Sequence, residues 1–135
     1  MNQDNYGTLP ASQRLQAAGI VIETECFWFI NKNWPERNKI INYKPTPSEM
    51  EQYIEGVYVI PAPSMAEVWR ELPIGLLVNG SWAELFISKR EESEFSYCGY
   101  RIEHRIIVSR EDPNPTDILI DLRIWVEEHK RKENP

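Results

Sequence analysis

Cysteine, histidine and glycine are scarce in this 135-residue chain, which contains two, two and six of them respectively. Cys26 and Cys98 lie far apart, and neither has a second Cys or His at the spacing of a zinc site. We therefore expect free thiols, as in proteins of a reducing compartment. The glycines form no phosphate-binding loop, and the chain has no Gly-x-Ser-x-Gly nucleophile motif. The chain therefore lacks the common sequence motifs of metal-binding and nucleotide-binding proteins, and we expect no cofactor.

Long apolar runs are absent as well. The longest, Cys26–Ile30, has five residues, whereas a helix that spans a membrane needs about 20. The opening residues Met1–Asn5 are polar and lack the basic and apolar regions of a secretory signal peptide. The net charge of −6 opposes non-specific attraction to nucleic acid and to anionic lipid. We expect a cytoplasmic protein without membrane attachment, and we do not expect a nucleic-acid partner.

The composition that is present is that of an ordinary folded domain, because 41% of the residues are hydrophobic and 27% are charged. A chain of this length buries enough surface to fold around one core without a disulfide or a metal. The sequence contains no internal repeat and no linker that would divide it. We therefore predict a single domain over residues 1–135, with residues 1–8 frayed.

Helix signals occur at several places along the chain. Thr46 with Glu49, and Ser64 with Glu67, have the spacing of capping boxes, which start helices. Near the C-terminus, apolar residues recur with the period of an amphipathic helix. We predict helices at residues 13–18, 47–55, 65–72 and 116–130.

Alternation of apolar and polar residues predicts strands over residues 20–30 and 98–108. The dipeptide Asn79-Gly80 is typical of a tight hairpin turn. The alternation over residues 98–108 is strict, so we expect one face of this strand to be covered and the other to be wet. His104 lies on the apolar side. We predict an α+β fold: an antiparallel sheet of four to five strands with helices packed mainly on one face and the C-terminal helix across the sheet.

Four residues are candidates for binding a partner: Trp34, Tyr97, Arg101 and Arg105. Polar residues surround Trp34, so we expect it to be partly exposed, and exposed tryptophans are enriched in binding hot spots. Tyr97, Arg101 and Arg105 share the wet side of the second predicted strand. Glu103 lies between the two arginines, which favours ion pairing on a solvated face over nucleic-acid binding.

A cleft near His104, Cys26 and Glu25 would indicate a different function, that of a small enzyme or a ligand-binding protein. His104 would be the general base there, although a histidine at the edge of the core, satisfied by hydrogen bonds, explains the same pattern. Glu23 and Glu25 would be about 7 Å apart on one strand face, a separation that suits paired catalytic carboxylates. The sequence predicts no pocket beside them, so we assign no catalytic residue and no metal ligand.

Three segments carry a resemblance to known proteins: Leu9–Ile20, Ile60–Pro73 and Asn114–Val126. They resemble small uncharacterised proteins carried by bacterial phages and other mobile elements. The positions concerned are capping and core residues, so the resemblance implies a shared fold and transfers no functional residue.

The lack of site chemistry and the five tryptophans together favour a role in binding over a role in catalysis. We predict a non-catalytic protein-interaction module that binds an unidentified protein partner or a second copy of itself. The predicted contact surface is a sheet edge or the region of Trp34. A small enzyme or ligand-binding protein stays open as the alternative.

Overall fold

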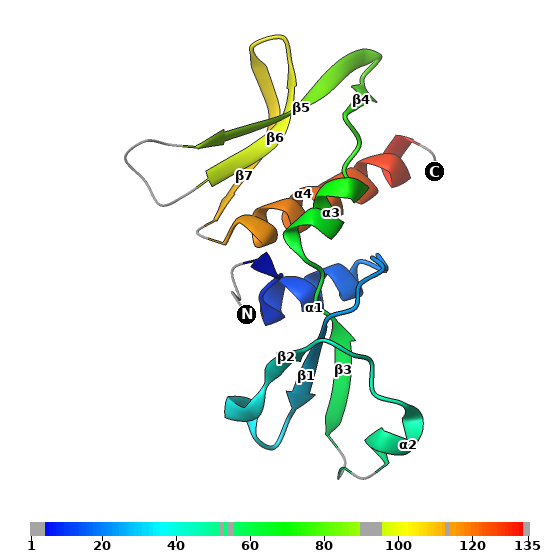
Figure 1. Cartoon of the computed structure of the whole chain (residues 1–135). Coiled ribbons are helices and arrows are strands. Elements are labelled where there is room, and N and C mark those ends of the chain that lie inside the picture. Colours follow the sequence, from blue (N-terminus) through cyan, green and yellow to red (C-terminus); the bar gives the residue numbers. More distant parts are fainter. Residues whose placement is uncertain (1–4, 52, 54–55, 90–95, 113, 134–135) are drawn as a thin grey trace.

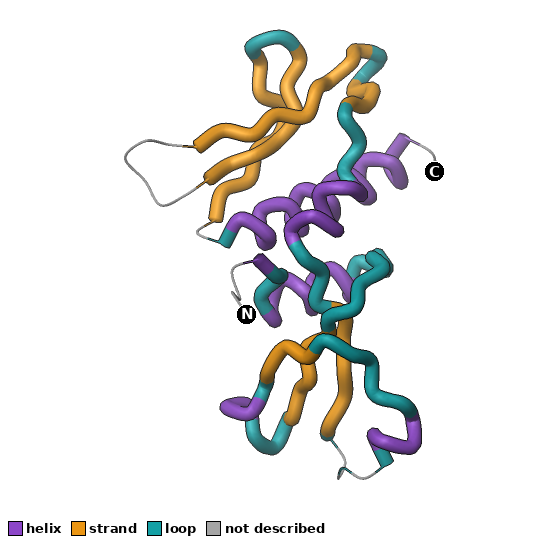
Figure 2. Tube along the Cα trace, in the orientation of Figure 1, coloured by secondary structure: helices purple, strands orange, loops and turns teal. Residues whose placement is uncertain are grey.

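The computed structural model describes residues 5–51, 53, 56–89, 96–112 and 114–133. Two antiparallel sheets lie at opposite ends of an elongated molecule, and helices lie between them (Figure 1). Figure 2 shows the same arrangement by type of secondary structure. In chain order the elements are α1 (Leu9–Ala17), β1 (Phe27–Asn31), η2 (Pro35–Arg37), β2 (Lys39–Ile41), α2 (Pro47–Met50), β3 (Val57–Pro61), α3 (Met65–Glu71), β4 (Gly75–Val78), β5 (Ser81–Lys89), β6 (Ser96–Ile102), β7 (Arg105–Asp112) and α4 (Pro115–Glu133).

The smaller sheet has three strands in the order β2-β1-β3, and the larger has four in the order β4-β5-β6-β7. Every pairing among the described strands is antiparallel. The predicted α+β class, with antiparallel pairing and a C-terminal helix against the sheet, is confirmed. The division of the strands between two sheets was not predicted.

The first predicted strand, over residues 20–30, is shorter in the structure than in the prediction. Only its last part enters β1, which begins at Phe27. Ile20 and Ile22 are instead buried in the main core beside helical residues. Because these two side chains pack into the core, residues 20–26 form a connecting segment between α1 and β1 that lies outside the sheet.

The predicted strand over residues 98–108 is wrong, because the chain turns back at Glu103 and His104 to form the hairpin of β6 and β7. The two-residue turn pairs Ile102 with Arg105 and shifts the alternation by one residue. An extra residue at a β-bulge in β7 shifts it back. Even-numbered residues therefore face α4 both in β6 and in β7 beyond the bulge. The alternation of apolar and polar residues continues across the turn, which is why the sequence predicts a single strand.

Helix starts are predicted well where the signal is a capping box. The Thr46 side chain accepts a hydrogen bond from the Glu49 N–H, and the Ser64 side chain accepts one from the Glu67 N–H. Both glutamate side chains accept the N–H of their cap residue in return. Both boxes start helices where predicted, although α2 ends at Met50 after a single turn.

Helix α4 is the central element of the described structure. Its long apolar side packs against β6 and β7 and also contacts α1 and α3. Ile118, Leu122 and Val126 are buried on this side. Trp125 is stacked on the buried ring of Tyr100 in β6, with ring centroids 5.8 Å apart. The main core therefore lies between the four-stranded sheet and the helical layer.

The N-terminal segment is held in place from its sixth residue onward. The Gly7 N–H donates to the Pro63 carbonyl oxygen at 3.0 Å, and the Trp28 indole N–H donates to the Gly7 carbonyl oxygen at 2.9 Å. The expected fraying of residues 1–8 therefore does not extend to this segment, while residues 1–4 lie outside the described residues.

Thr8 joins the first turns of two helices. Its side chain caps α1, so the helix starts earlier than predicted. Its N–H and its hydroxyl donate to the two carboxylate oxygens of Asp117 in α4, at 2.8 and 2.6 Å. Asp117 is buried, and this burial raises the pKa of its carboxyl group above the ordinary value of 3.8, while the bonds from Thr8 oppose the shift. This contact fixes the start of α1 against the first turn of α4, and the ion pair of Arg14 with Asp121 joins the same two helices further along.

Substitution of Asp117 by Asn should change the dependence of stability on pH. A carboxyl group whose pKa is raised on folding stabilises the fold most below its unfolded pKa, and this contribution is lost as pH rises through the folded pKa. The free energy of unfolding of the wild type, minus that of Asp117→Asn, should therefore decrease as pH rises above 3.8. Urea denaturation at a series of pH values measures this difference.

Glu127→Gln is the matched control for this measurement. A hydrogen bond from Arg123 lowers the pKa of the Glu127 carboxyl group, so its contribution should grow as pH rises. A difference for Asp117→Asn that also grows with pH would contradict the assignment of a raised pKa to Asp117.

Candidate functional site

The four predicted partner-binding residues do not form one surface. Trp34 lies beside the three-stranded sheet, directly before η2, and is 49% exposed, as expected. Arg101 in β6 and Arg105 at the start of β7 belong to the other sheet, at the other end of the molecule (Figure 1). The backbone of Tyr97 lies in β6, and its side chain is outside the described residues.

Arg101 and Arg105 lie on opposite faces of the four-stranded sheet, because a turn separates them. Cross-strand partners share a sheet face. Arg105 pairs with Ile102, which packs against the main core. Arg101 pairs with Glu84, on the face that points away from α4.

This second face of the four-stranded sheet is the candidate site. Successive residues of a strand point to opposite faces. Ala83 is fully buried on the α4 side, so Trp82 and Glu84 lie on the other side. We call this surface the outer face and define it by six of the residues that strand alternation and cross-strand pairing place there: Leu77, Trp82, Glu84, Phe86, Arg101 and Ile106.

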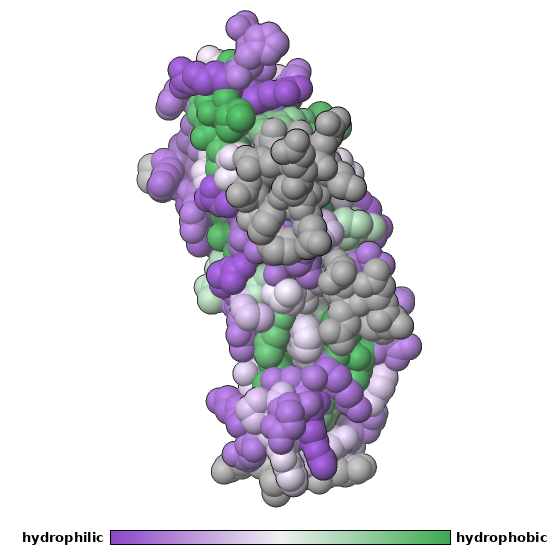
Figure 3. All heavy atoms as spheres, turned by 90° about the vertical axis from the view of Figure 1, so that its left-hand side faces the viewer, coloured by the Kyte–Doolittle hydropathy of each residue, from purple (hydrophilic) through white to green (hydrophobic). Residues whose placement is uncertain are grey.

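Large apolar side chains are exposed on the outer face. Leu77, Trp82 and Ile106 are each more than half exposed, and Trp82 reaches 56%. Trp82 lies against Gly75 of β4, where an added Cβ would be 2.3 Å from its ring. Glycine at this position therefore lets the indole lie close to the backbone of the neighbouring strand. Figure 3 shows apolar surface in the upper part of the molecule, over this sheet.

Two residues of opposite charge, Glu84 and Arg101, occupy facing positions on β5 and β6. Arg101 lies across from Glu84 on one side and from Ile106 on the other. The carbon of its guanidinium group is 5.3 Å from the centroid of the Phe86 ring, which is itself buried. The outer face thus combines acidic and basic groups with aromatic and aliphatic surface.

His129 in α4 contacts the backbone of β4, and the sequence did not predict this contact. Its Nε2 is within hydrogen-bond distance, 2.9 Å, of the Leu77 carbonyl oxygen in β4. Its ring is stacked on Trp125 with centroids 5.1 Å apart and an interplanar angle of 9°. It therefore joins the outermost strand of the sheet to α4, through a contact between residues 52 positions apart.

The thiol in the core has no access to a substrate. Cys98 lies on the α4 side of β6 and is buried. Burial raises the pKa of its thiol to about 12, whereas a nucleophilic cysteine requires a lowered pKa and exposure. Tyr100, two residues further on, is also buried, and its hydroxyl donates to the Pro73 carbonyl oxygen at 2.8 Å. Both residues therefore serve packing.

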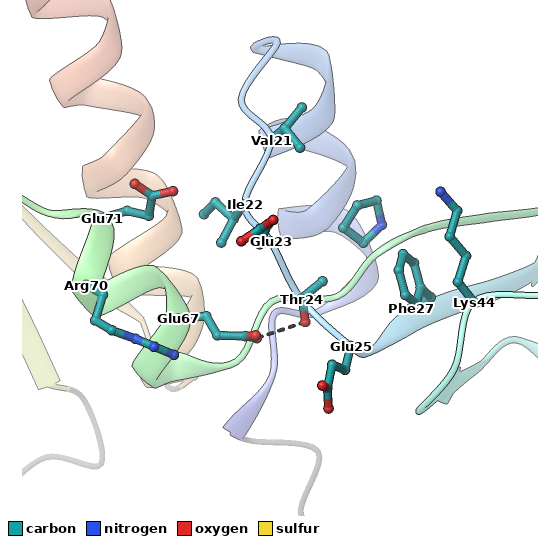
Figure 4. A pocket seen from close by; sticks show the side chains of 11 residues that line it. Val21, Ile22, Glu23, Thr24, Glu25, Phe27, Lys44, Glu67, Arg70 and Glu71 are labelled. Atoms are coloured by element: carbon teal, nitrogen blue, oxygen red, sulfur yellow. Dashed lines mark hydrogen bonds between the residues drawn. The ribbon is translucent and has the colours of Figure 1, made fainter.

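A cleft of about 700 Å³ lies between α3 and the segment that connects α1 to β1. Figure 4 shows the side chains that line it. The Thr24 hydroxyl donates to the Glu67 carboxylate at 2.8 Å across the cleft, and the same carboxylate oxygen accepts the Ser64 N–H. The charged lining residues are Glu23, Glu25, Lys44, Glu67, Arg70 and Glu71.

The cleft contains Glu25 but not the other two residues of the predicted enzymatic site. His104 lies in the turn between β6 and β7, exposed and in the other sheet. Cys26 is next to Glu25 in the chain but forms a hydrogen bond with Tyr6, which raises the pKa of Tyr6. Glu23 and Glu25 are exposed, whereas a carboxyl group that acts as a general acid is usually desolvated. The convergence of His104, Cys26 and Glu25 on one cleft, which the alternative enzymatic function requires, is therefore not found.

No protein-family model, curated protein or solved structure matches the chain. Among the described residues, no group of three or more His, Cys, Asp and Glu is arranged to hold a metal ion. The helices that these residues form are too short or too polar to cross a membrane. The function is therefore inferred from the surfaces of the molecule alone.

Substitution of His129 by Ala should weaken the attachment of β4. The variant loses one hydrogen bond, worth about 1 kcal/mol, and a ring stack worth about 0.5–1.5 kcal/mol. We expect the free energy of unfolding to fall by about 1–2 kcal/mol, measured by urea denaturation. Lys130→Ala is the control, because this exposed neighbour should change stability by no more than about 0.5 kcal/mol. Equal stability of the two variants would show that His129 does not anchor the strand.

Proposed function

We propose that the chain is a non-catalytic protein-interaction module and that its outer face binds a protein partner. The observation that carries this proposal is the exposure of Leu77, Trp82 and Ile106 on one sheet face. An antiparallel sheet covered by a helix on one face usually presents polar residues on the other. Exposed apolar residues that gather on a surface typically mark an interaction site.

The composition of the outer face supports the same function. Cores of protein interfaces are enriched in aromatic residues and arginine, and the outer face exposes both Trp82 and Arg101. Complete burial of a large apolar side chain contributes about 1.5–3 kcal/mol. Burial of the remaining surface of Leu77, Trp82 and Ile106 in an interface would therefore contribute about 1 kcal/mol each. Trp82 is the expected hot spot, because Trp dominates such positions.

A second copy of the chain is the partner that the outer face fits best. Glu84 and Arg101 lie side by side on it, so two copies related by a two-fold axis can pair each arginine with the glutamate of the other copy. Such isologous contacts are the commonest oligomeric interfaces. The face is four strands wide and its longest strand has nine residues, which gives an area of roughly 500 Å². Stable complexes bury about 800 Å² per partner, so we expect a weak dimer with a micromolar dissociation constant.

The non-catalytic part of the proposal is supported by the positions of the reactive groups. The Cys98 thiol is buried, and His104 lies in the β6–β7 turn of the four-stranded sheet, whereas Glu25 and Cys26 directly precede β1 of the three-stranded sheet. An origin in phages or mobile elements is supported by the sequence resemblance of the capping and core segments. A cytoplasmic location is supported by the two free cysteines.

Trp82→Ala should abolish or strongly weaken self-association. Truncation of a hot-spot residue costs about 2 kcal/mol or more, which corresponds to a dissociation constant raised by about 30-fold. Sedimentation equilibrium over a range of protein concentrations measures this constant. Trp34→Ala is the matched control, because Trp34 is 49% exposed against 56% for Trp82 but lies on the other sheet.

Two results together would contradict the proposed function: the wild type stays monomeric, and Trp82→Ala removes no protein that copurifies with it. A monomer from which Trp82→Ala removes one stoichiometric protein would retain the function but replace the second copy by a different partner. An equal loss in Trp34→Ala would move the interface to the three-stranded sheet.

A further inference from the structure

The segment from Lys32 to Lys44 carries positive charge in an otherwise acidic chain. It contains four Lys and Arg residues and one acidic residue, Glu36, and hence a formal charge of +3, whereas the whole chain has −6. It belongs to the three-stranded sheet, at the other end of the molecule from the outer face (Figure 1). We call it the hairpin surface and define it by its exposed cations and aromatics: Lys32, Trp34, Arg37, Lys39, Tyr43 and Lys44.

Two aromatic rings of the hairpin surface are exposed, Trp34 in the loop before η2 and Tyr43 beyond the end of β2. Trp34 and Tyr43 are each about half exposed, and neither belongs to the main core. The carbon of the Arg37 guanidinium group is 4.2 Å from the centroid of the Trp34 ring. This contact holds a permanent positive charge next to an aromatic face. One nucleotide could therefore place its base on or beside the indole and its phosphate near the guanidinium group.

The loop that carries Trp34 is fixed by side chains of the loop itself. The Asn38 side-chain oxygen accepts the Asn31 N–H at 2.8 Å. The Asn31 side-chain oxygen accepts the N–H groups of Asn33 and Trp34 at 3.0 and 3.1 Å. The backbone position of Trp34 is thus set before any partner arrives. Preorganisation of this kind lowers the entropy that binding costs.

We propose that the hairpin surface binds single-stranded nucleic acid. Phosphate groups contact Lys32, Arg37 and Lys39, while bases stack on Trp34 and Tyr43. Positively charged surfaces with exposed aromatic rings are the general means by which proteins hold single strands without sequence preference. Lys44 also lines the cleft that contains Glu25, so we assign the phosphate contacts to the other three cations.

A single strand fits these observations better than a duplex or an acidic protein. The bases of a duplex are stacked on each other and cannot reach an exposed ring. An acidic protein would use the charges but would leave both aromatic faces without a specific role. The proposal goes beyond the proposed protein interaction, since it concerns a different sheet and different residues.

Binding of a fluorescein-labelled oligothymidylate to the full chain, followed by fluorescence anisotropy, tests the proposal. Each phosphate contact with a single strand contributes about −0.7 to the slope of log affinity against log salt concentration. Three contacts predict a slope of about −2. Lys39→Gln should bring the slope closer to zero by about 0.7.

The stacking part of the proposal is tested by Trp34→Ala. A base stacked on an aromatic side chain contributes about 1–3 kcal/mol, so the dissociation constant should rise about fivefold or more. Tyr43→Ala is a second variant with the same expectation. Trp69→Ala is the control, because Trp69 in α3 is 41% exposed but belongs to neither the hairpin surface nor the outer face, and it should bind the oligonucleotide like the wild type. Melting temperatures show whether each variant is folded.

Three results would overturn the proposal. One is the absence of an anisotropy change at low salt concentration. Another is unchanged affinity in both Trp34→Ala and Tyr43→Ala. The third is equally strong competition by a polyglutamate peptide, which would identify the hairpin surface as a site for acidic proteins. None of these results bears on the outer face, so this proposal and the proposed function can fail separately.

Discussion

Burial of one side of α4 is the constraint on which the rest of the structure depends. Ile118, Leu122 and Val126 fill the space between the four-stranded sheet and the helical layer, and each such side chain contributes about 1.5–3 kcal/mol when buried. In the first turn of the helix, Asp117 accepts two hydrogen bonds from Thr8. Near the last turn, His129 contacts the Leu77 carbonyl oxygen in β4. One helix thus holds both the sheet and the N-terminal segment.

This arrangement determines which surfaces are left for binding. Because α4 covers one face of the four-stranded sheet, Leu77, Trp82 and Ile106 on the opposite face stay more than half exposed. The three-stranded sheet packs through α1 and the N-terminal segment, as the bond from Trp28 to Gly7 shows. Its hairpin, with Trp34, extends away from the helices (Figure 1). The molecule therefore presents two chemically different surfaces, one at each end.

The sequence predicted those parts of the fold that depend on local interactions. The capping box at Thr46 and the half-exposed position of Trp34 follow from neighbouring residues, and both are found in the structure. The turn at His104 was missed because a bulge restores the alternation that the turn interrupts. Trp82 and His129 were missed for another reason. Their roles depend on which sheet face α4 covers, and on a contact between residues 52 positions apart.

Site-resolved ¹⁹F NMR can show whether the outer face is an interaction surface. The chain would be labelled with 5-fluorotryptophan, and Trp82→Phe and Trp34→Phe would assign the two resonances. If the outer face binds a partner, the Trp82 resonance shifts and loses contact with solvent as the concentration of the protein or of a copurifying partner is increased, while the Trp34 resonance stays constant. A Trp82 resonance that remains solvent-exposed and unchanged under all these conditions would show that the outer face is not an interaction surface.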